Sequence, residues 1–131
     1  MNPAITVGLT TYNRSAYLRE AIESVLAQSF DEYVLVVCDN ASTDATANVV
    51  EEYRRRDARV RYHRQRRNVG RVANIYDALF RATTPYVAWL MDDDLWLPRH
   101  LSEGFRRLEA HPDAVLYACA AEGFEGSETR V

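Results

Sequence analysis

The feature that most limits how this chain can fold is an alternation of short apolar runs with segments in which apolar side chains recur at helical spacing. Short apolar runs are typical of strands inside a parallel sheet, and spacings of three and four residues are typical of amphipathic helices. Strands are expected over residues 4–9, 33–38, 60–63, 86–91 and 114–120. The sequence therefore predicts an α/β fold in the order β-α-β-α-β-α-β-α-β, a Rossmann-like, mostly parallel sheet with helices on both faces.

The expected strand Tyr86–Met91 leads directly into three adjacent carboxylates, Asp92, Asp93 and Asp94. The strand is expected to be buried on both faces, with Trp89 packed in the core. Three like charges this close repel one another, and a divalent cation with oxygen ligands would compensate them. An acidic turn that only stabilises the N-terminus of the next helix is the simpler alternative.

Polar residues follow each of the first four expected strands at its carboxyl end. These clusters cover residues 10–14, 39–44, 64–71 and 92–94. Ligands of open α/β sheets bind at this end of the strands, so all four clusters should line one rim. They offer carboxylates for a metal ion, a hydrogen-bond acceptor for a base or ribose, and arginines for phosphate. This combination fits a nucleoside diphosphate with Mg²⁺ or Mn²⁺.

Composition excludes several classes of function. All 16 basic residues are arginine, so a P-loop lysine, a pyridoxal Schiff base and a lysine nucleophile are absent from this sequence. The net charge of −3 gives no reason to expect a nucleic acid partner. No apolar run approaches the roughly 18 residues of a membrane-spanning helix, so no transmembrane segment is expected. Cys38 and Cys119 lie in apolar runs and are expected to be buried free thiols, which favours a cytoplasmic location.

The polar clusters resemble those of the family 2 glycosyltransferases, which have the GT-A fold, and the resemblance covers nearly the whole chain. It rests on sequence elements that follow one another at family spacing: residues 10–14 (Thr-Thr-Tyr-Asn-Arg), 24–30, 37–44, 68–70 with Asn74, and 86–96. Each element is weak alone, whereas their order and spacing together make the signal specific.

The resemblance implies transfer of a sugar, with inversion, from a nucleotide donor to an acceptor hydroxyl. The donor in this family is usually a UDP-sugar. By position, Thr10 and Tyr12 would border the nucleobase and ribose, and Asp39 would hydrogen-bond the base. Asn68 would belong to the same nucleotide site, and Arg71 would contact the base or the diphosphate.

The carboxylates after Met91 correspond to the Asp-x-Asp-type element of the family. Asp92 would touch the ribose, Asp93 would be the main ligand of Mg²⁺ or Mn²⁺, and Asp94 would be the second metal ligand. The sequence departs from the family at one point. Many members read Leu-Asp-x-Asp-Asp, and here Met91 occupies the first Asp position.

The catalytic base of the family comes from the second half of the domain, together with the surface for the acceptor. The base is therefore expected beyond Val131, and residues 1–131 are expected to form a single nucleotide-sugar-binding domain, the N-terminal part of a longer transferase. Glu122, Glu125 and Glu128 are expected to be solvated loop carboxylates. The acceptor, whether carbohydrate, lipid or small molecule, is not identified. An exposed sheet edge and apolar surface would favour a homo-oligomer.

Three other readings of the sequence remain open. A non-catalytic nucleotide-sugar-binding module would carry the same clusters. A nucleotidyltransferase shares the sheet architecture but would need a glycine-rich loop after the first strand, where residues 10–14 lack glycine. A receiver-like signalling domain also carries acidic residues at strand ends, but it would need a lysine that this chain lacks.

Overall fold

The computed structural model describes residues 2–125 and 128–130, and helices alternate with strands from the first strand to the fourth helix. The elements are β1 (Ile5–Thr11), α1 (Ser15–Leu26), β2 (Tyr33–Asp39), α2 (Thr46–Arg56), β3 (Val60–Arg64), α3 (Arg71–Phe80), β4 (Tyr86–Met91), α4 (His100–Ala110), β5 (Gly123–Glu125) and β6 (Glu128–Arg130).

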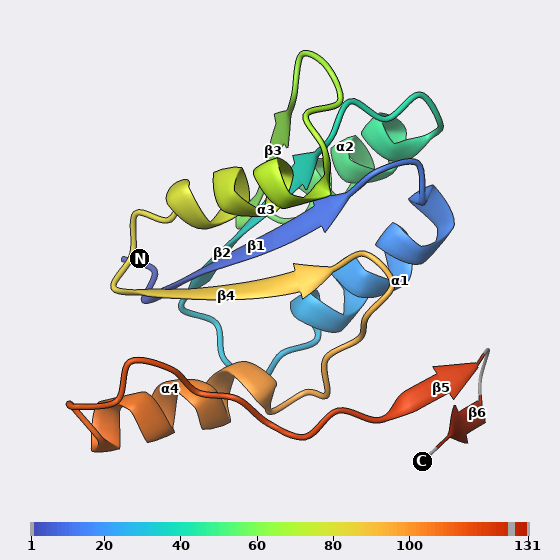
Figure 1. The fold of residues 1–131 in the computed structure, drawn as a ribbon. Coiled ribbons are helices and arrows are strands. Elements are labelled where there is room, and N and C mark those ends of the chain that lie inside the picture. Colours follow the sequence, from blue (N-terminus) through green and yellow to red (C-terminus); the bar gives the residue numbers. More distant parts are fainter. Residues whose placement is uncertain (1, 126–127, 131) are drawn as a thin grey trace.

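The main sheet contains four parallel strands in the order β3-β2-β1-β4 (Figure 1). The strands β5 and β6 pair antiparallel in a separate hairpin. The prediction of a Rossmann-like, mostly parallel α/β sheet is therefore confirmed, and β3 lies at a sheet edge. Each crossover between parallel strands contains a helix, which is the arrangement that such connections require.

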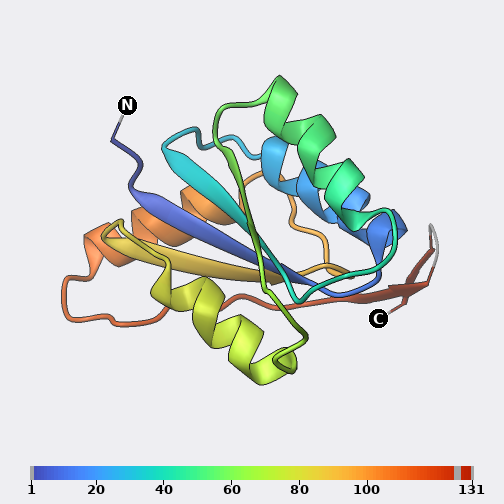
Figure 2. The same cartoon turned by 90° about the horizontal axis from the view of Figure 1, so that it is seen from above.

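Helices cover both faces of the sheet, as predicted (Figure 2). On one face, alternate residues of β1 and β2 pack against α1, α2 and α4 in the larger part of the core. Leu9, Leu18 and Leu35 are fully buried there. On the other face, Val36 and Cys38 of β2 pack against Ala78 of α3. Burial of such side chains supplies most of the free energy that favours folding.

Gly8 allows α3 to lie close to β1. A Cβ atom on Gly8 would lie 3.2 Å from Cβ of Ala78, which is tighter than ordinary van der Waals contact. Because α3 begins at the carboxyl ends of the strands, this contact in its second half also fixes where its first turn lies. The glycine in β1 therefore helps to place the residues around Arg71.

The prediction that Tyr86–Met91 is buried on both faces is wrong. Val87 is 47% exposed and Trp89 is 41% exposed, so Trp89 is not a core residue. The cause is the strand order. β4 is an edge strand, and α3 makes more contact with β1 and β2 than with β4. One side of β4 therefore faces solvent beside the helix.

The strand expected over residues 114–120 is also absent. This segment follows α4 and forms no strand (Figure 1). A strand requires a neighbour to accept and donate its backbone hydrogen bonds. Among the described residues, the segment makes no backbone hydrogen bond to β4, and Val115 and Leu116 are largely exposed. The apolar run therefore has the composition of a strand but no partner strand.

The two cysteines differ in environment. Both are free thiols, and Cys38 is buried as predicted. Cys119 is exposed, so the prediction of its burial is wrong, because the segment that carries it does not join the sheet. Burial raises the pKa of the Cys38 thiol to about 12, which keeps it protonated and unreactive. In the part of the chain described, no helix has the length and apolar character needed to cross a membrane.

Candidate functional site

The carboxyl ends of the four parallel strands lie side by side at one edge of the sheet, which we call the rim. The register places Thr11 of β1 beside Asp39 of β2, and Asp39 beside Arg64 of β3. On the other side of β1, Thr10 pairs with Met91 of β4. The strand order and register therefore bring the polar clusters of all four strand ends to one rim.

A cleft of about 350 Å³ opens at the rim, within the size range of sites for small molecules. Strands β1 and β4, the start of α3 and the loops after β1, β2 and β3 supply its walls. Its lining residues are Thr10, Thr11, Tyr12, Arg14, Asn40, Asn68, Gly70, Arg71, Asn74, Met91 and Asp92. Five predicted nucleotide-binding residues belong to this lining: Thr10, Tyr12, Asn68, Arg71 and Asp92.

Asp92 forms part of the cleft floor and is almost completely buried. Its Oδ2 atom accepts a hydrogen bond of 2.8 Å from the hydroxyl of Thr11, and the backbone N–H of Tyr12 also donates to its carboxylate. Burial raises the pKa of Asp92 above its ordinary value, although these hydrogen bonds and the charge of Arg14 act in the opposite direction. The last residue of β1 and the loop after it therefore hold this carboxylate in one orientation.

Arg14 joins the first two carboxylates of the acidic cluster. Its Nη1 atom donates to Oδ2 of Asp93 over 2.6 Å and lies 3.6 Å from Oδ1 of Asp92. The hydrogen bond to Asp93 and the charges of both carboxylates raise the pKa of Arg14. Asp92 and Asp93 therefore face one point, which is occupied by a positively charged group.

Asp94 lies at the end of the same turn. Its backbone N–H donates to the carbonyl oxygen of Met91 over 3.2 Å. Burial and the neighbouring charge of Asp93 raise the pKa of Asp94. It is not part of the cleft lining. The structure therefore brings Asp92 and Asp93 together around Arg14, and it leaves Asp94 outside that contact.

Asp39 is fully buried and lies outside the cleft lining. Its Oδ1 atom accepts the backbone N–H of Ser42 over 2.9 Å, and its Oδ2 atom accepts the hydroxyl of Tyr62 over 2.6 Å. Arg64 lies 3.7 Å from the same carboxylate and donates to the carbonyl oxygen of Ser42. Burial and the bond to Asp39 raise the pKa of Tyr62, so its hydroxyl remains a donor. Asp39 therefore holds the loop after β2 in place.

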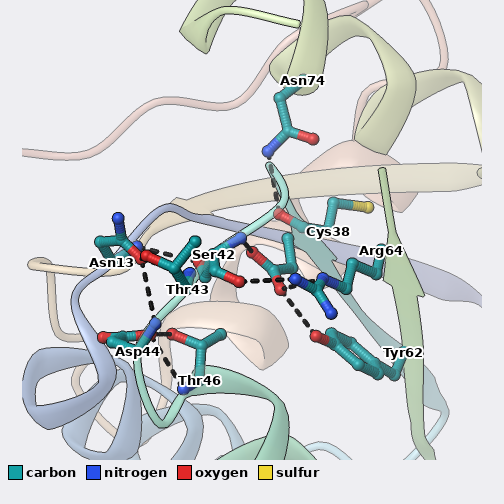
Figure 3. Close-up of polar contacts among 10 residues, drawn as sticks. Asn13, Cys38, Ser42, Thr43, Asp44, Thr46, Tyr62, Arg64 and Asn74 are labelled. Atoms are coloured by element: carbon teal, nitrogen blue, oxygen red, sulfur yellow. Dashed lines mark hydrogen bonds and ion pairs between the residues drawn. The ribbon is translucent and has the colours of Figure 1, made fainter. Parts of the chain in front are cut away.

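The loop after β1 is fastened to the loop after β2. Asn13 adopts a positive φ of 51°, and its side-chain oxygen accepts the backbone N–H of Thr43 over 2.7 Å (Figure 3). The backbone N–H of Asn13 donates to Ser42, and that of Ser15 donates to Asp44. Asparagine tolerates this left-handed conformation better than most residues. These bonds fix the backbone on both sides of Arg14.

Three of the residues that line the cleft are asparagines: Asn40, Asn68 and Asn74. The side chain of Asn40 donates to Asn68 over 2.9 Å and accepts the backbone N–H of Val69 over 2.8 Å. Asn74 donates to the carbonyl oxygen of Cys38 at the end of β2 (Figure 3). The loop that leads into α3 is therefore tied to β2, and Arg71 enters the cleft from the first position of that helix.

Six lining residues are not among the site residues predicted from the sequence: Thr11, Arg14, Asn40, Gly70, Asn74 and Met91. All six lie within or beside the polar clusters, so their positions in the sequence were a usable signal. The sequence does not show that Arg14 contacts Asp93, because this contact joins residues that are 79 positions apart.

Asp92 and Asp93, which we call the acidic pair, fit a divalent cation, although the described residues do not supply a complete set of metal ligands. In the described chain, no three His, Cys, Asp or Glu side chains gather around one point. Mg²⁺ is usually bound by one or two carboxylates together with substrate phosphates and water. Asp92 and Asp93 supply such a pair, and the position of the Arg14 guanidinium shows that both face the same cation.

The family model "Glycosyl transferase family 2" matches residues 6–130. Among curated proteins, an uncharacterised glycosyltransferase of Methanocaldococcus jannaschii is 33% identical over 116 residues, which are 87% of this chain and 40% of that protein. This chain spans about two fifths of the length of several curated relatives that it matches.

Two of the solved structures that share the fold are complexes with a nucleotide or a nucleotide sugar. The crystal structure of S. aureus TarS 1–349 in complex with UDP has a TM-score of 0.76 and 28% identity, and the match covers 86% of this chain and 33% of TarS 1–349. A mannosyltransferase of Pyrobaculum calidifontis, in complex with GDP-Man and Mn²⁺, has a TM-score of 0.74 and 26% identity. That match covers 82% of this chain and 33% of the mannosyltransferase.

Proposed function

The chain belongs to glycosyltransferase family 2, and on this basis we propose that it forms the donor-binding part of an enzyme that transfers a sugar from a nucleoside diphosphate to an acceptor hydroxyl. The observation that carries the proposal is the polar cleft at the rim, whose lining residue Asp92 faces one cation together with the adjacent Asp93. Transfer with inversion belongs to the same proposal.

The proposed donor is a UDP-sugar. The fold similarity to TarS, whose structure contains UDP, supports this choice. The mannosyltransferase with GDP-Man makes GDP the natural competitor in a binding test. Thr10, Tyr12, Asn68, Arg71 and Asp92 are the proposed nucleotide contacts, because they line the cleft. Asp39 is the predicted hydrogen-bond partner of the nucleobase. Its carboxylate is buried and holds the loop after β2, so this contact requires the loop to open.

Asp93 is the proposed main metal ligand, and Asp92 faces the same cation position. Asp94 stays the proposed second ligand, although it lies outside the contact with Arg14. A divalent ion bound here, Mg²⁺ or Mn²⁺, would neutralise charge on the leaving diphosphate as a Lewis acid. Thr11 orients Asp92 through the hydrogen bond to its Oδ2 atom, which leaves Oδ1 facing the cation position. The mannosyltransferase structure with Mn²⁺ supports the choice of a divalent ion.

The acceptor hydroxyl needs a general base. We propose that this base, and the surface for the acceptor, come from residues beyond Val131, and that residues 1–131 are one domain of the enzyme. We also propose a cytoplasmic location, where reducing conditions suit the exposed free thiol of Cys119. Fractionation of cells that produce the native protein tests the location.

A non-catalytic nucleotide-sugar-binding module is the second candidate. The observation that favours it is the chemistry of the lining. In the described chain, Asp92 is the one carboxylate of the cleft, and hydrogen bonds from Thr11 and Tyr12 already hold it. A module of this kind would bind the donor without turnover. Sugar transfer by the native protein would exclude this candidate.

We further propose that the chain self-associates through an apolar face on α3 and β4. The face consists of Val72, Tyr76, Phe80, Val87 and Trp89, all of them exposed large apolar residues. Tyr76 and Phe80 stack with ring centroids 6.2 Å apart. Contiguous apolar surface beside an edge strand is typical of a site of protein association.

Calorimetric titration of UDP, with GDP and dTDP as controls, tests the proposed function. Each titration is run with and without Mn²⁺ on wild type, on Asp93→Ala and on Asp113→Ala. The last variant is a control that removes an exposed carboxylate from the segment after α4. We expect binding of one nucleotide that requires Mn²⁺, is lost in Asp93→Ala and is kept in Asp113→Ala. The absence of nucleotide binding by a folded wild-type chain would overturn the proposal.

A further inference from the structure

Arg14 faces the acidic pair and the cleft at the same time. Its Nη1 atom lies 2.6 Å from Asp93 and 3.6 Å from Asp92, and its side chain is also part of the cleft lining. About half of the side chain is exposed to solvent. The single guanidinium is therefore within reach of both the carboxylates and any anionic group that enters the cleft.

The backbone that carries Arg14 is held firmly, whereas its guanidinium is not. Hydrogen bonds join Asn13 to Thr43 and Ser15 to Asp44, one on each side of Arg14. In the described chain, the guanidinium forms its ion pairs only with Asp92 and Asp93. Solvent screens a half-exposed ion pair of this kind, so little free energy holds it closed. The side chain can therefore turn while the loop stays in place.

A guanidinium and a divalent cation cannot both occupy the point that Asp92 and Asp93 face. Two positive charges that both contact these carboxylates would repel each other strongly. A divalent ion that bonds directly to carboxylate oxygens competes well against a guanidinium held by one hydrogen bond. An arginine that is displaced inside the cleft finds its natural partner in phosphate, since its planar fork matches phosphate oxygens.

We propose that Arg14 is an exchangeable counter-ion of the acidic pair. It neutralises Asp93 while no metal ion is bound, and it turns to the phosphates of the nucleotide when a divalent ion takes its place. This proposal rests on the proposed function, because it requires a metal ion and a nucleotide in this cleft. It assigns Arg14 as a donor-binding residue that couples metal binding to donor binding.

The two halves of this role predict effects of opposite sign for one variant, Arg14→Gln. With Mn²⁺ alone as the probe, we expect binding to be tighter by roughly two- to fivefold, because a weak competing ion pair is removed. With UDP as the probe at saturating Mn²⁺, we expect binding to be weaker by about tenfold, because a charge-assisted contact to phosphate is lost. Arg14→Lys keeps the positive charge and should restore most of the UDP affinity.

Arg19→Gln is a matched control. Arg19 lies on α1, is also partly exposed, and forms an ion pair of 2.9 Å with Glu52 away from the cleft. Both titrations should be unchanged in this variant, and thermal melting should show that all variants are folded. A merely structural role of Arg14 would weaken both binding events together, or neither.

The outcomes separate this inference from the proposed function. If wild type binds Mn²⁺ and UDP, and Arg14→Gln fails to change the two affinities in opposite directions, the role of Arg14 is overturned while the donor site stands. If folded wild type binds neither Mn²⁺ nor UDP, the proposed function and the role of Arg14 are overturned together.

Discussion

The hydroxyl of Tyr62 donates a hydrogen bond of 2.6 Å to the fully buried carboxylate of Asp39. This bond joins β3 to β2 beneath the loop that carries one wall of the cleft. The backbone N–H of Ser42 completes the arrangement by donating to the other oxygen of Asp39. A buried carboxylate requires such partners, because an unpaired charge away from water is costly.

We expect Asp39→Asn to destabilise the fold by about 1–3 kcal/mol, because the amide cannot accept from both Tyr62 and Ser42 in the same way. Urea denaturation of wild type and variant measures this change. Tyr62→Phe should cost about 1.5–3 kcal/mol, because the buried carboxylate loses one of its hydrogen-bond donors. Asp93→Asn is the control, and it should change stability little, since Asp93 is partly exposed. Equal stability of wild type and Asp39→Asn would contradict a structural role for this carboxylate.

The sequence was sufficient to predict the rim, because its evidence is local. Three strands of the main sheet are apolar runs and β3 alternates, but polar residues follow all four at once. Parallel strands with helical crossovers must place those residues on one edge. Asp92 and Thr10 reach the cleft for this reason. Their positions follow from the strand ends without knowledge of any distant contact.

Features that depend on which strands are neighbours could not be predicted from the sequence. Trp89 belongs to an apolar run that looks like a buried strand, and its exposure follows from the place of β4 at a sheet edge. Asp39 follows β2 as expected, and its burial depends on Tyr62 of another strand. The ion pair of Arg14 with Asp93 likewise depends on the packing of β1 against β4.

Acid should weaken the fold partly through Asp57, at the turn between α2 and β3. Hydrogen bonds from Arg59, the closest at 2.7 Å, hold the pKa of Asp57 below its ordinary value of 3.8. The unfolded chain therefore takes up this proton at a higher pH than the folded chain. The stability that Asp57 contributes is present above its unfolded pKa and is lost as the pH falls through its lower, folded pKa.

Asp57→Asn should therefore be less stable than wild type near neutral pH, and the difference should shrink as the pH falls below about 4. Urea denaturation at a series of pH values measures the difference in free energy of unfolding. Asp113→Asn changes an exposed carboxylate and should leave the pH dependence of wild type intact. A difference that stays constant with pH would show that Asp57 acts through something other than its charge.

Gly70 should resist substitution because of its backbone alone. It lies at the start of α3 and lines the cleft, with φ of 87° and ψ of 156°. Residues other than glycine rarely adopt this backbone conformation, so Gly70→Ala should destabilise the fold by roughly 1–3 kcal/mol. A Cβ atom there would meet no other atom within 4 Å, so a steric clash is not the cause. Thermal and urea denaturation measure the loss, and an undiminished stability would contradict the strained conformation.

Self-association should depend on the apolar face of α3 and β4. Phe80 is 84% exposed, so Phe80→Glu adds a charge to this face without removing a core side chain. We expect light scattering to report a concentration-dependent dimer for wild type and a monomer for Phe80→Glu, with similar melting temperatures.

Tyr17→Glu is the matched control, because Tyr17 is an exposed aromatic residue on α1, which covers the opposite face of the sheet. A monomeric wild type at high concentration would contradict self-association. A dimer that survives Phe80→Glu but not Tyr17→Glu would place the contact on the other side of the sheet.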